Sequence, residues 1–254
     1  MTNQSSVSNA ISESTQKPAL VPFLTAGYPN KAQFVKDLVE ASEHAAVVEV
    51  GVPFSDPMAD GVTIQQSSRV ALDGGATLAW IFEAIKSQRS SLQAPVMLMS
   101  YLNPLLAYGY DDLVQSSLDS GVAGFIVPDL PLEESMELAQ VLDSADLALV
   151  QLVTPVTPEE RLQKLCQQST GFVYAVTMTG ITGSAIKGKE NLNEYLDLVR
   201  TKSSVPVCAG FGIATAADVS RLEGHADGAV VGTALIKAVG RGERPGDFLK
   251  GLRP

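Results

Sequence analysis

Strand-like and helix-like segments alternate along this chain from Ala19 onward, and this alternation restricts the possible folds more than any other feature. Short runs rich in Val, Ile and Leu that end at Gly, Pro or Asp indicate buried strands. The expected strands are 19–25, 47–52, 95–102, 123–127, 147–153, 171–178, 205–209 and 228–231. A segment with helical spacing of its apolar residues follows each strand, as at 31–44, where Asn30 is the expected N-cap.

Eight β/α units in series, without a break in composition, predict a single-domain (β/α)8 TIM barrel over residues 19–254. The alternative is a doubly wound open sheet, but its Gly-x-Gly-x-x-Gly turn after the first strand is absent. Apolar residues make up 45% of the chain, enough for a large core. Residues 1–18 are rich in Ser, Thr, Asn and Gln and lack the apolar stretch of a signal peptide. We expect them to form a mostly disordered polar tail.

Composition excludes several classes of function. The net charge of −10 argues against binding to nucleic acid, whose phosphates attract basic surfaces. No apolar run approaches the roughly 20 residues that would span a membrane. Cys166 and Cys208 fit neither a metal nor a disulfide spacing, which is typical of a reducing cytoplasm. The two histidines fall at helix ends and no expected strand carries a lysine, which argues against zinc and Schiff-base chemistry.

Carboxylates are therefore the main candidates for chemistry. Glu49 interrupts a run of valines, and strand alternation places it on the barrel interior while Val48 and Val50 face the helices. Such a carboxyl should have a raised pKa and could act as a general acid. Asp60 follows in a turn-rich loop, where a solvated carboxylate would stay ionised and complete an acid/base pair. A structural ion pair is the alternative for Glu49, and a turn-forming role is the alternative for Asp60 and Asp56.

Glycine-rich loops follow the last three expected strands. In a barrel, a phosphate often binds the loops after strands seven and eight and a helix N-terminus. Gly212, Gly232 and Thr233 lie in those loops, and Gly183 follows strand six, although glycines can also simply end strands. Tyr174 on strand six could assist catalysis or could be an aromatic core residue.

Several blocks of the sequence resemble the tryptophan synthase α chain family. The most specific is the segment EVGVPFSDPMADG at 49–61. Other blocks agree in order and spacing, namely PFLTAGYP at 22–29, YLNP at 101–104, PDLPLEE at 128–134, TGITG at 179–183, GFGI at 210–213 and VGTA at 231–234. The likeness covers about Ala19 to Lys237, and the glycine loops are shared with other phosphate-binding barrels.

The resemblance implies retro-aldol cleavage of indole-3-glycerol phosphate to indole and glyceraldehyde 3-phosphate. It assigns proton transfer to Glu49, recognition of the indole N–H to Asp60 and an active-site position to Tyr174. It places Phe23 in the indole pocket and Thr182 in a mobile loop over the site. The phosphate would bind at Gly183, Gly212, Gly232 and Thr233.

The resemblance also implies a partner, a tryptophan synthase β chain that uses pyridoxal phosphate, in an α2β2 heterotetramer. Pro53, Asp56 and Asn103 would lie on the surface that faces it, and this chain itself would need no metal or other cofactor. Two alternatives stay open: a subunit that mainly activates the β chain, and a stand-alone lyase that releases free indole.

Three departures from the family pattern bear on these alternatives. The polar tail replaces an amphipathic N-terminal helix, Val62 replaces a common proline, and Met178 replaces a position that is often basic or polar.

Overall fold

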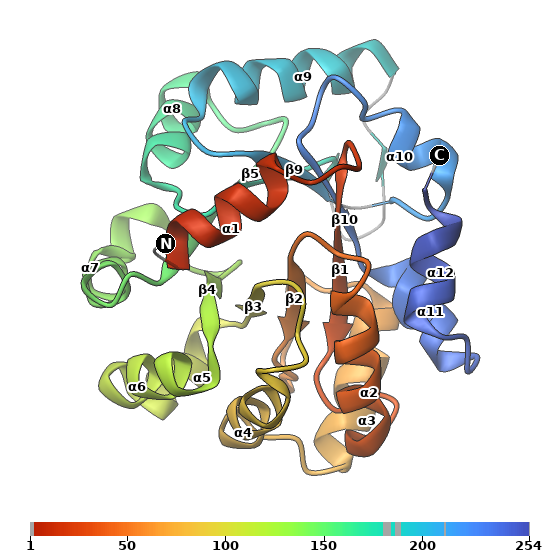
Figure 1. Ribbon diagram of the computed structural model, residues 1–254. Coiled ribbons are helices and arrows are strands. Elements are labelled where there is room, and N and C mark those ends of the chain that lie inside the picture. Colours follow the sequence, from red (N-terminus) through yellow and green to blue (C-terminus); the bar gives the residue numbers. More distant parts are fainter. Residues whose placement is uncertain (1–2, 180–183, 186–188, 211, 254) are drawn as a thin grey trace.

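The computed structural model describes residues 3–179, 184–185, 189–210 and 212–253. Eight parallel strands close into a barrel in the order β1-β10-β9-β6-β5-β4-β3-β2, which confirms the predicted (β/α)8 fold (Figure 1). The barrel strands are β1 (Ala19–Thr25), β2 (Val48–Gly51), β3 (Val96–Met99), β4 (Val122–Ile126), β5 (Ala148–Val153), β6 (Val173–Val176), β9 (Val207–Gly210) and β10 (Gly228–Val231). The short strands β7 (Met178–Thr179) and β8 (Ser184–Ala185) form a separate antiparallel pair.

Helices surround the barrel, and their starts follow from local sequence. Asn30 caps the first outer helix by accepting a hydrogen bond of 2.9 Å from the Gln33 N–H, as predicted, and Thr77 caps α4 in the same way. The outer helices are α2 (Lys31–Ser42), α3 (Val62–Asp73), α4 (Leu78–Gln88), α5 (Leu102–Tyr108), α6 (Tyr110–Ser120), α7 (Met136–Ser144), α8 (Glu159–Gln168), α9 (Lys189–Lys202), α10 (Ala216–Ser220), α11 (Thr233–Gly240) and α12 (Pro245–Gly251). A 3-10 turn, η1 (Leu132–Glu134), precedes α7.

Strand alternation divides the core into two layers. Val48, Val50 and Val52 belong to the layer between the strands and the helices. Val47, Met97 and Tyr174 belong to the layer inside the barrel. The side of β2 that carries Glu49 therefore faces the barrel interior, as the valine pattern predicted.

The prediction of a disordered tail at the N-terminus is wrong for most of that segment. Residues Asn3–Ser12 form helix α1, which crosses the end of the barrel where the strands begin (Figure 1). Val7 and Ile11, one helical turn apart, are completely buried there. The Ser8 hydroxyl donates to the Gly171 carbonyl at 2.6 Å, so even the polar side of α1 is held by the barrel. This polar segment thus closes the end of the barrel where the strands begin.

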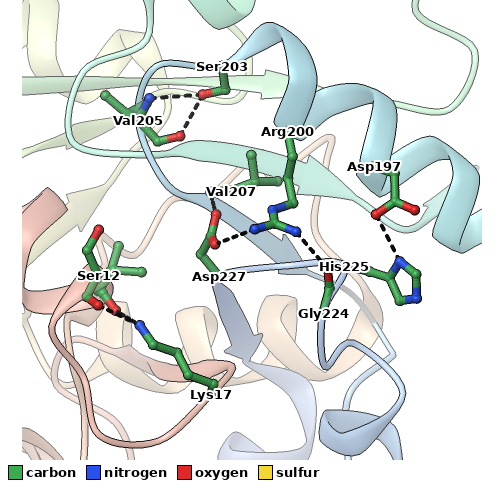
Figure 2. A network of polar contacts seen from close by, with 11 residues as sticks. Ser12, Lys17, Asp197, Arg200, Ser203, Val205, Val207, Gly224, His225 and Asp227 are labelled. Carbon is green, nitrogen blue, oxygen red and sulfur yellow. Dashed lines mark hydrogen bonds and ion pairs between the residues drawn. The ribbon is translucent and has the colours of Figure 1, made fainter.

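Ion pairs and hydrogen bonds surround this end of the barrel (Figure 2). The Lys17 ammonium donates to the Ile11 carbonyl at 2.9 Å and to the Ser12 carbonyl at 2.7 Å, which stabilises the C-terminus of α1. Arg200 on α9 donates to the Gly224 carbonyl at 2.6 Å and pairs with Asp227 at 3.4 Å. These contacts join α9 to the start of β10.

Among the described residues, no helix is both long enough and apolar enough to cross a membrane.

Candidate active site

Glu49 lies inside the barrel near the end where the strands finish. On β2 it is level with Phe23 of β1 and Met97 of β3. Its side chain is completely buried, and neither carboxyl oxygen has a hydrogen-bond partner among the described residues. Burial raises the pKa of Glu49 from 4.5 to about 8, because the charged form loses its hydration. No described residue therefore forms an ion pair with Glu49, and the carboxyl is suited to donate a proton near neutral pH.

Asp60 lies at the end of the loop that joins β2 to α3. The loop is fixed by Gln65, whose amide donates to the Asp60 carbonyl at 2.8 Å and whose backbone N–H donates to the Gly61 carbonyl. Partial burial raises the pKa of Asp60, and a hydrogen bond from the Tyr101 side chain opposes that rise. The Asp60 carboxylate is thus less solvated than predicted, and it has a hydrogen-bond partner in Tyr101 from the next β/α unit.

Two aromatic rings line the mouth of the barrel, and two glycines make room for them. Phe23 passes close to β2: a side chain at Gly51 would place its Cβ 2.3 Å from the Phe23 ring. Tyr174 on β6 leans over β9 in the same way, because a Cβ at Gly210 would lie 2.4 Å from the Tyr174 hydroxyl oxygen. Sequence reasoning placed Gly210 in a phosphate loop and gave Gly51 no role. In the structure, the missing side chain of Gly51 makes room for the Phe23 ring, and that of Gly210 makes room for the Tyr174 ring.

Tyr174, one of these two rings, lies close enough to Glu49 and Asp60 for their charges to influence its hydroxyl. Its ring is buried on the interior face with Phe172, at a centroid distance of 6.4 Å. Burial raises the pKa of the Tyr174 hydroxyl, and the charges of Glu49 and Asp60 raise it further. The hydroxyl therefore stays protonated, and the three side chains form one electrostatic cluster.

The helices after β9 and β10 differ at their N-termini. Thr215 and Asp218 form a capping box at α10, so its first backbone N–H groups already have side-chain partners. The start of α11 has Gly232 as N-cap and no side-chain cap. Its unpaired N–H groups and its helix dipole favour an anion.

The described residues that were predicted to bind phosphate lie near these two helix N-termini. Gly232 and Thr233 lie at the α11 terminus, and a Cβ at Gly232 would lie 3.7 Å from the Phe23 Cβ, which places the terminus beside Phe23. Gly212 adopts a φ of +82°, a conformation that favours glycine. Thr182 and Gly183 lie outside the described residues.

The rim formed by the units of β2 to β5 carries exposed apolar side chains. Of the residues predicted to face a partner, Asp56 and Asn103 are exposed, whereas Pro53 is buried within the chain. Met58, in the same loop as Asp56, is also exposed, and sequence reasoning missed three neighbours that follow the next strands, Leu106, Met136 and Val156; all four are at least half exposed. Apolar side chains gathered on one rim are typical of a protein-binding surface.

Two further observations complete the site. Among the described residues there is no group of three or more His, Cys, Asp or Glu side chains that could hold a metal ion. Val62 is the first residue of α3 and is exposed, so it stands where a proline would also fit and leaves Asp60 in place. The side chain of Met178 is outside the described residues.

Comparison with known proteins gives one consistent result. The family model for the tryptophan synthase alpha chain matches residues 10–248. The tryptophan synthase alpha chain of Bacillus cereus (strain ATCC 10987 / NRS 248) is 43% identical over 224 residues, covering 87% of this chain and 86% of that protein. A chain of the tryptophan synthase α2β2 complex from Pyrococcus furiosus matches with a TM-score of 0.84 and 34% identity, covering 93% of this chain and 98% of that chain. A tryptophan synthase structure from Mycobacterium tuberculosis gives a TM-score of 0.87 at 29% identity, covering 99% and 98%.

Proposed function

The chain belongs to the tryptophan synthase alpha chain family, and from this premise we propose how it cleaves indole-3-glycerol phosphate to indole and glyceraldehyde 3-phosphate. The observation that carries the proposal is the Glu49 carboxyl, which is buried inside the barrel without a hydrogen-bond partner among the residues that the structure describes. It lies in the segment most specific to the family, where a proton donor with a pKa of about 8 is available at neutral pH.

The reaction needs one proton at C3 of the indole ring and the loss of one from a hydroxyl. Glu49 donates its proton to C3, which turns the ring into a cationic indolenine. The bond between C3 and the glycerol carbon then breaks, and its electron pair restores the indole ring. The hydroxyl on the departing carbon becomes the aldehyde and returns its proton to Glu49, so atoms and charge balance.

Asp60 stabilises the cationic intermediate. Its carboxylate accepts a hydrogen bond from the indole N–H, and this interaction strengthens as positive charge develops on the ring. Partial burial lowers the local dielectric around Asp60, which makes the interaction stronger than it would be in water. Phe23 and Tyr174 pack against the flat faces of the indole.

The phosphate of the substrate binds at the N-terminus of α11. Gly232 and Thr233 present backbone N–H groups there, and Gly212 lets the preceding loop approach closely. The family resemblance assigns Thr182 and Gly183 to the same site, and both lie outside the described residues. The first N–H groups of α10 already have side-chain partners, so the phosphate binds at α11 instead.

A tryptophan synthase β chain is the partner, in an α2β2 assembly like that of the Pyrococcus furiosus relative. The exposed rim of Asp56, Met58, Asn103 and Leu106 forms the contact surface, and buried Pro53 shapes the loop beneath it. Pyridoxal phosphate belongs to the β chain, whereas the chemistry assigned here to the α chain uses only side chains and backbone groups. We place the complex in the cytoplasm.

The test is indole release from indole-3-glycerol phosphate, measured with and without a cognate β chain. We expect wild type to be weakly active alone and more active in the complex. Glu49→Gln should lower kcat by about 10²- to 10⁴-fold, the range for loss of a general acid. Equal activity of wild type and Glu49→Gln would refute the assignment. Stimulation of the β chain by wild type without any cleavage would favour a purely activating subunit.

A further inference from the structure

Tyr101 is buried beside Asp60, yet sequence reasoning gave it no catalytic task. It directly precedes α5, at the end of β3, and only 5% of its surface is exposed. Its ring packs against Phe54 in the Asp60 loop, with ring centroids 5.2 Å apart and planes inclined by 31°. The backbone after it is fixed as well, because the Leu102 N–H donates to Asp129 at 2.9 Å. Tyr101 is therefore a rigid support for the loop.

The hydroxyl of Tyr101 connects to the loop at two points. The Ala59 backbone N–H donates to the hydroxyl oxygen at 2.9 Å, and the Asp60 carboxyl is the second partner. A phenol has a single proton to donate. An ionised carboxylate can only accept, so the Tyr101 hydroxyl donates its proton to Asp60 while its oxygen accepts from the Ala59 N–H. One side chain thus fixes the backbone before Asp60 and the side chain of Asp60 itself.

We propose that Tyr101 is a positioning residue for the lyase reaction, holding the Asp60 carboxylate toward the indole N–H through its hydroxyl. The proposal rests on the function assigned above and adds to it a residue that does not touch the substrate in this account. A hydrogen bond to the charged form of a carboxyl favours that form. Tyr101 therefore also keeps Asp60 ionised in a partly buried place, where desolvation alone would favour the neutral acid.

Charged neighbours influence the pKa of both phenols near Asp60. The charge of Asp60 raises the pKa of Tyr101 and of Tyr174, and the charge of Asp129 also raises the pKa of Tyr101. All three effects disfavour an ionised phenol, so burial and neighbouring charge both raise the pKa of the Tyr101 hydroxyl and keep it protonated. The donor is therefore present throughout the working pH range of the reaction.

The test is the substitution Tyr101→Phe, which removes the hydroxyl and keeps the ring. We expect kcat/KM for indole-3-glycerol phosphate to fall about tenfold to hundredfold, as for a lost hydrogen bond to a charged group. The matched control is Tyr108→Phe at the last residue of α5, the helix that Tyr101 precedes. There the hydroxyl pairs with Ser116 at 2.9 Å and the ring packs on Phe82, so removing it should leave kcat/KM within twofold.

A second readout does not depend on activity. The pKa of Asp60, followed by ¹³C NMR of its carboxyl carbon, should rise in Tyr101→Phe and stay unchanged in Tyr108→Phe. If the Asp60 pKa stays fixed, or if it rises without any loss of kcat/KM, the positioning role is refuted. If wild type and Glu49→Gln release indole equally, the proposed function fails instead, and the NMR result still shows whether the hydroxyl acts on Asp60.

Discussion

The two ends of the barrel differ in how their polar groups are paired. We call the end where the strands begin the lower end, and the end where they finish the upper end. At the lower end, Val7 and Ile11 fill the opening, and Lys17 satisfies the last carbonyls of α1, with the Gln16 amide nitrogen as an unpaired exception. At the upper end, both oxygens of Glu49 lack partners among the described residues and the start of α11 has no side-chain cap. The lower end is thus built for stability, and the upper end keeps polar groups free for a substrate at a cost in stability.

The largest expected effect concerns the stability cost of Glu49. Its pKa is about 8 in the folded chain against 4.5 for the ordinary side chain, so between these values the folded chain holds a proton that the unfolded chain has lost. The free energy of unfolding should therefore fall as pH rises from 5 to 8, by about 3 to 5 kcal/mol from this group alone. Glu49→Gln, which cannot ionise, should lose that component.

Urea unfolding of wild type and Glu49→Gln at several pH values measures the difference. Glu83→Gln, the same substitution at an exposed position on α4, is the control and should follow wild type. Parallel pH dependences for wild type and Glu49→Gln would mean that Glu49 is ionised in the folded chain.

A substitution at the lower end should reduce stability without reducing activity. Ile11→Ala removes a completely buried side chain and should lower the free energy of unfolding by about 2 to 4 kcal/mol. The kcat for indole release should stay within twofold, because the catalytic groups lie at the other end. Ser12→Ala, at an exposed position of the same helix, should change neither quantity. A loss of kcat in Ile11→Ala under conditions where the variant is folded would show that the two ends of the barrel are not independent.

The free helix terminus at the upper end allows a charge test. Thr233→Asp adds a carboxylate at the first position of α11, where it complements the helix dipole but repels the substrate phosphate. We expect KM to rise about tenfold or more, with a small gain in stability, on the basis of like-charge repulsion at close range. Ala216→Asp at the first position of capped α10 should leave KM unchanged. Equal KM values for both variants would place the phosphate elsewhere.

The smallest expected effect is at Val62. Proline fits the first turn of a helix, and Val62→Pro should stabilise the chain by about 0.4 to 1 kcal/mol. The kcat should stay close to wild type, because Asp60 is already held by Tyr101. Val70→Pro within α3 should instead destabilise by about 3 kcal/mol. A large change of kcat in Val62→Pro would show that the Asp60 loop depends on this residue.

Sequence alone predicted the elements whose signals are local. The alternation of strand and helix gave the barrel, and the valine pattern around Glu49 gave its inward direction, because strand periodicity determines which side chains share a face. The N-terminal helix escaped prediction because its only buried anchors are two apolar residues in a polar segment. Its stability comes from the barrel that it covers.

The environment of Asp60 and the task of the glycines also escaped prediction, for a related reason. Tyr101 reaches the Asp60 loop from 42 positions away along the chain, and the rings that need Gly51 and Gly210 come from neighbouring strands. Such contacts depend on how the units pack around the barrel. A pattern within one β/α unit does not contain them.

The end of the barrel where the strands finish keeps Glu49 protonated near neutral pH, without a partner among the described residues. The most direct test is ¹³C NMR of the Glu49 carboxyl carbon as a function of pH, with the resonance assigned by its absence in Glu49→Gln. We expect a titration midpoint near pH 8. A midpoint near 4.5, the value of an ordinary glutamate, would contradict it.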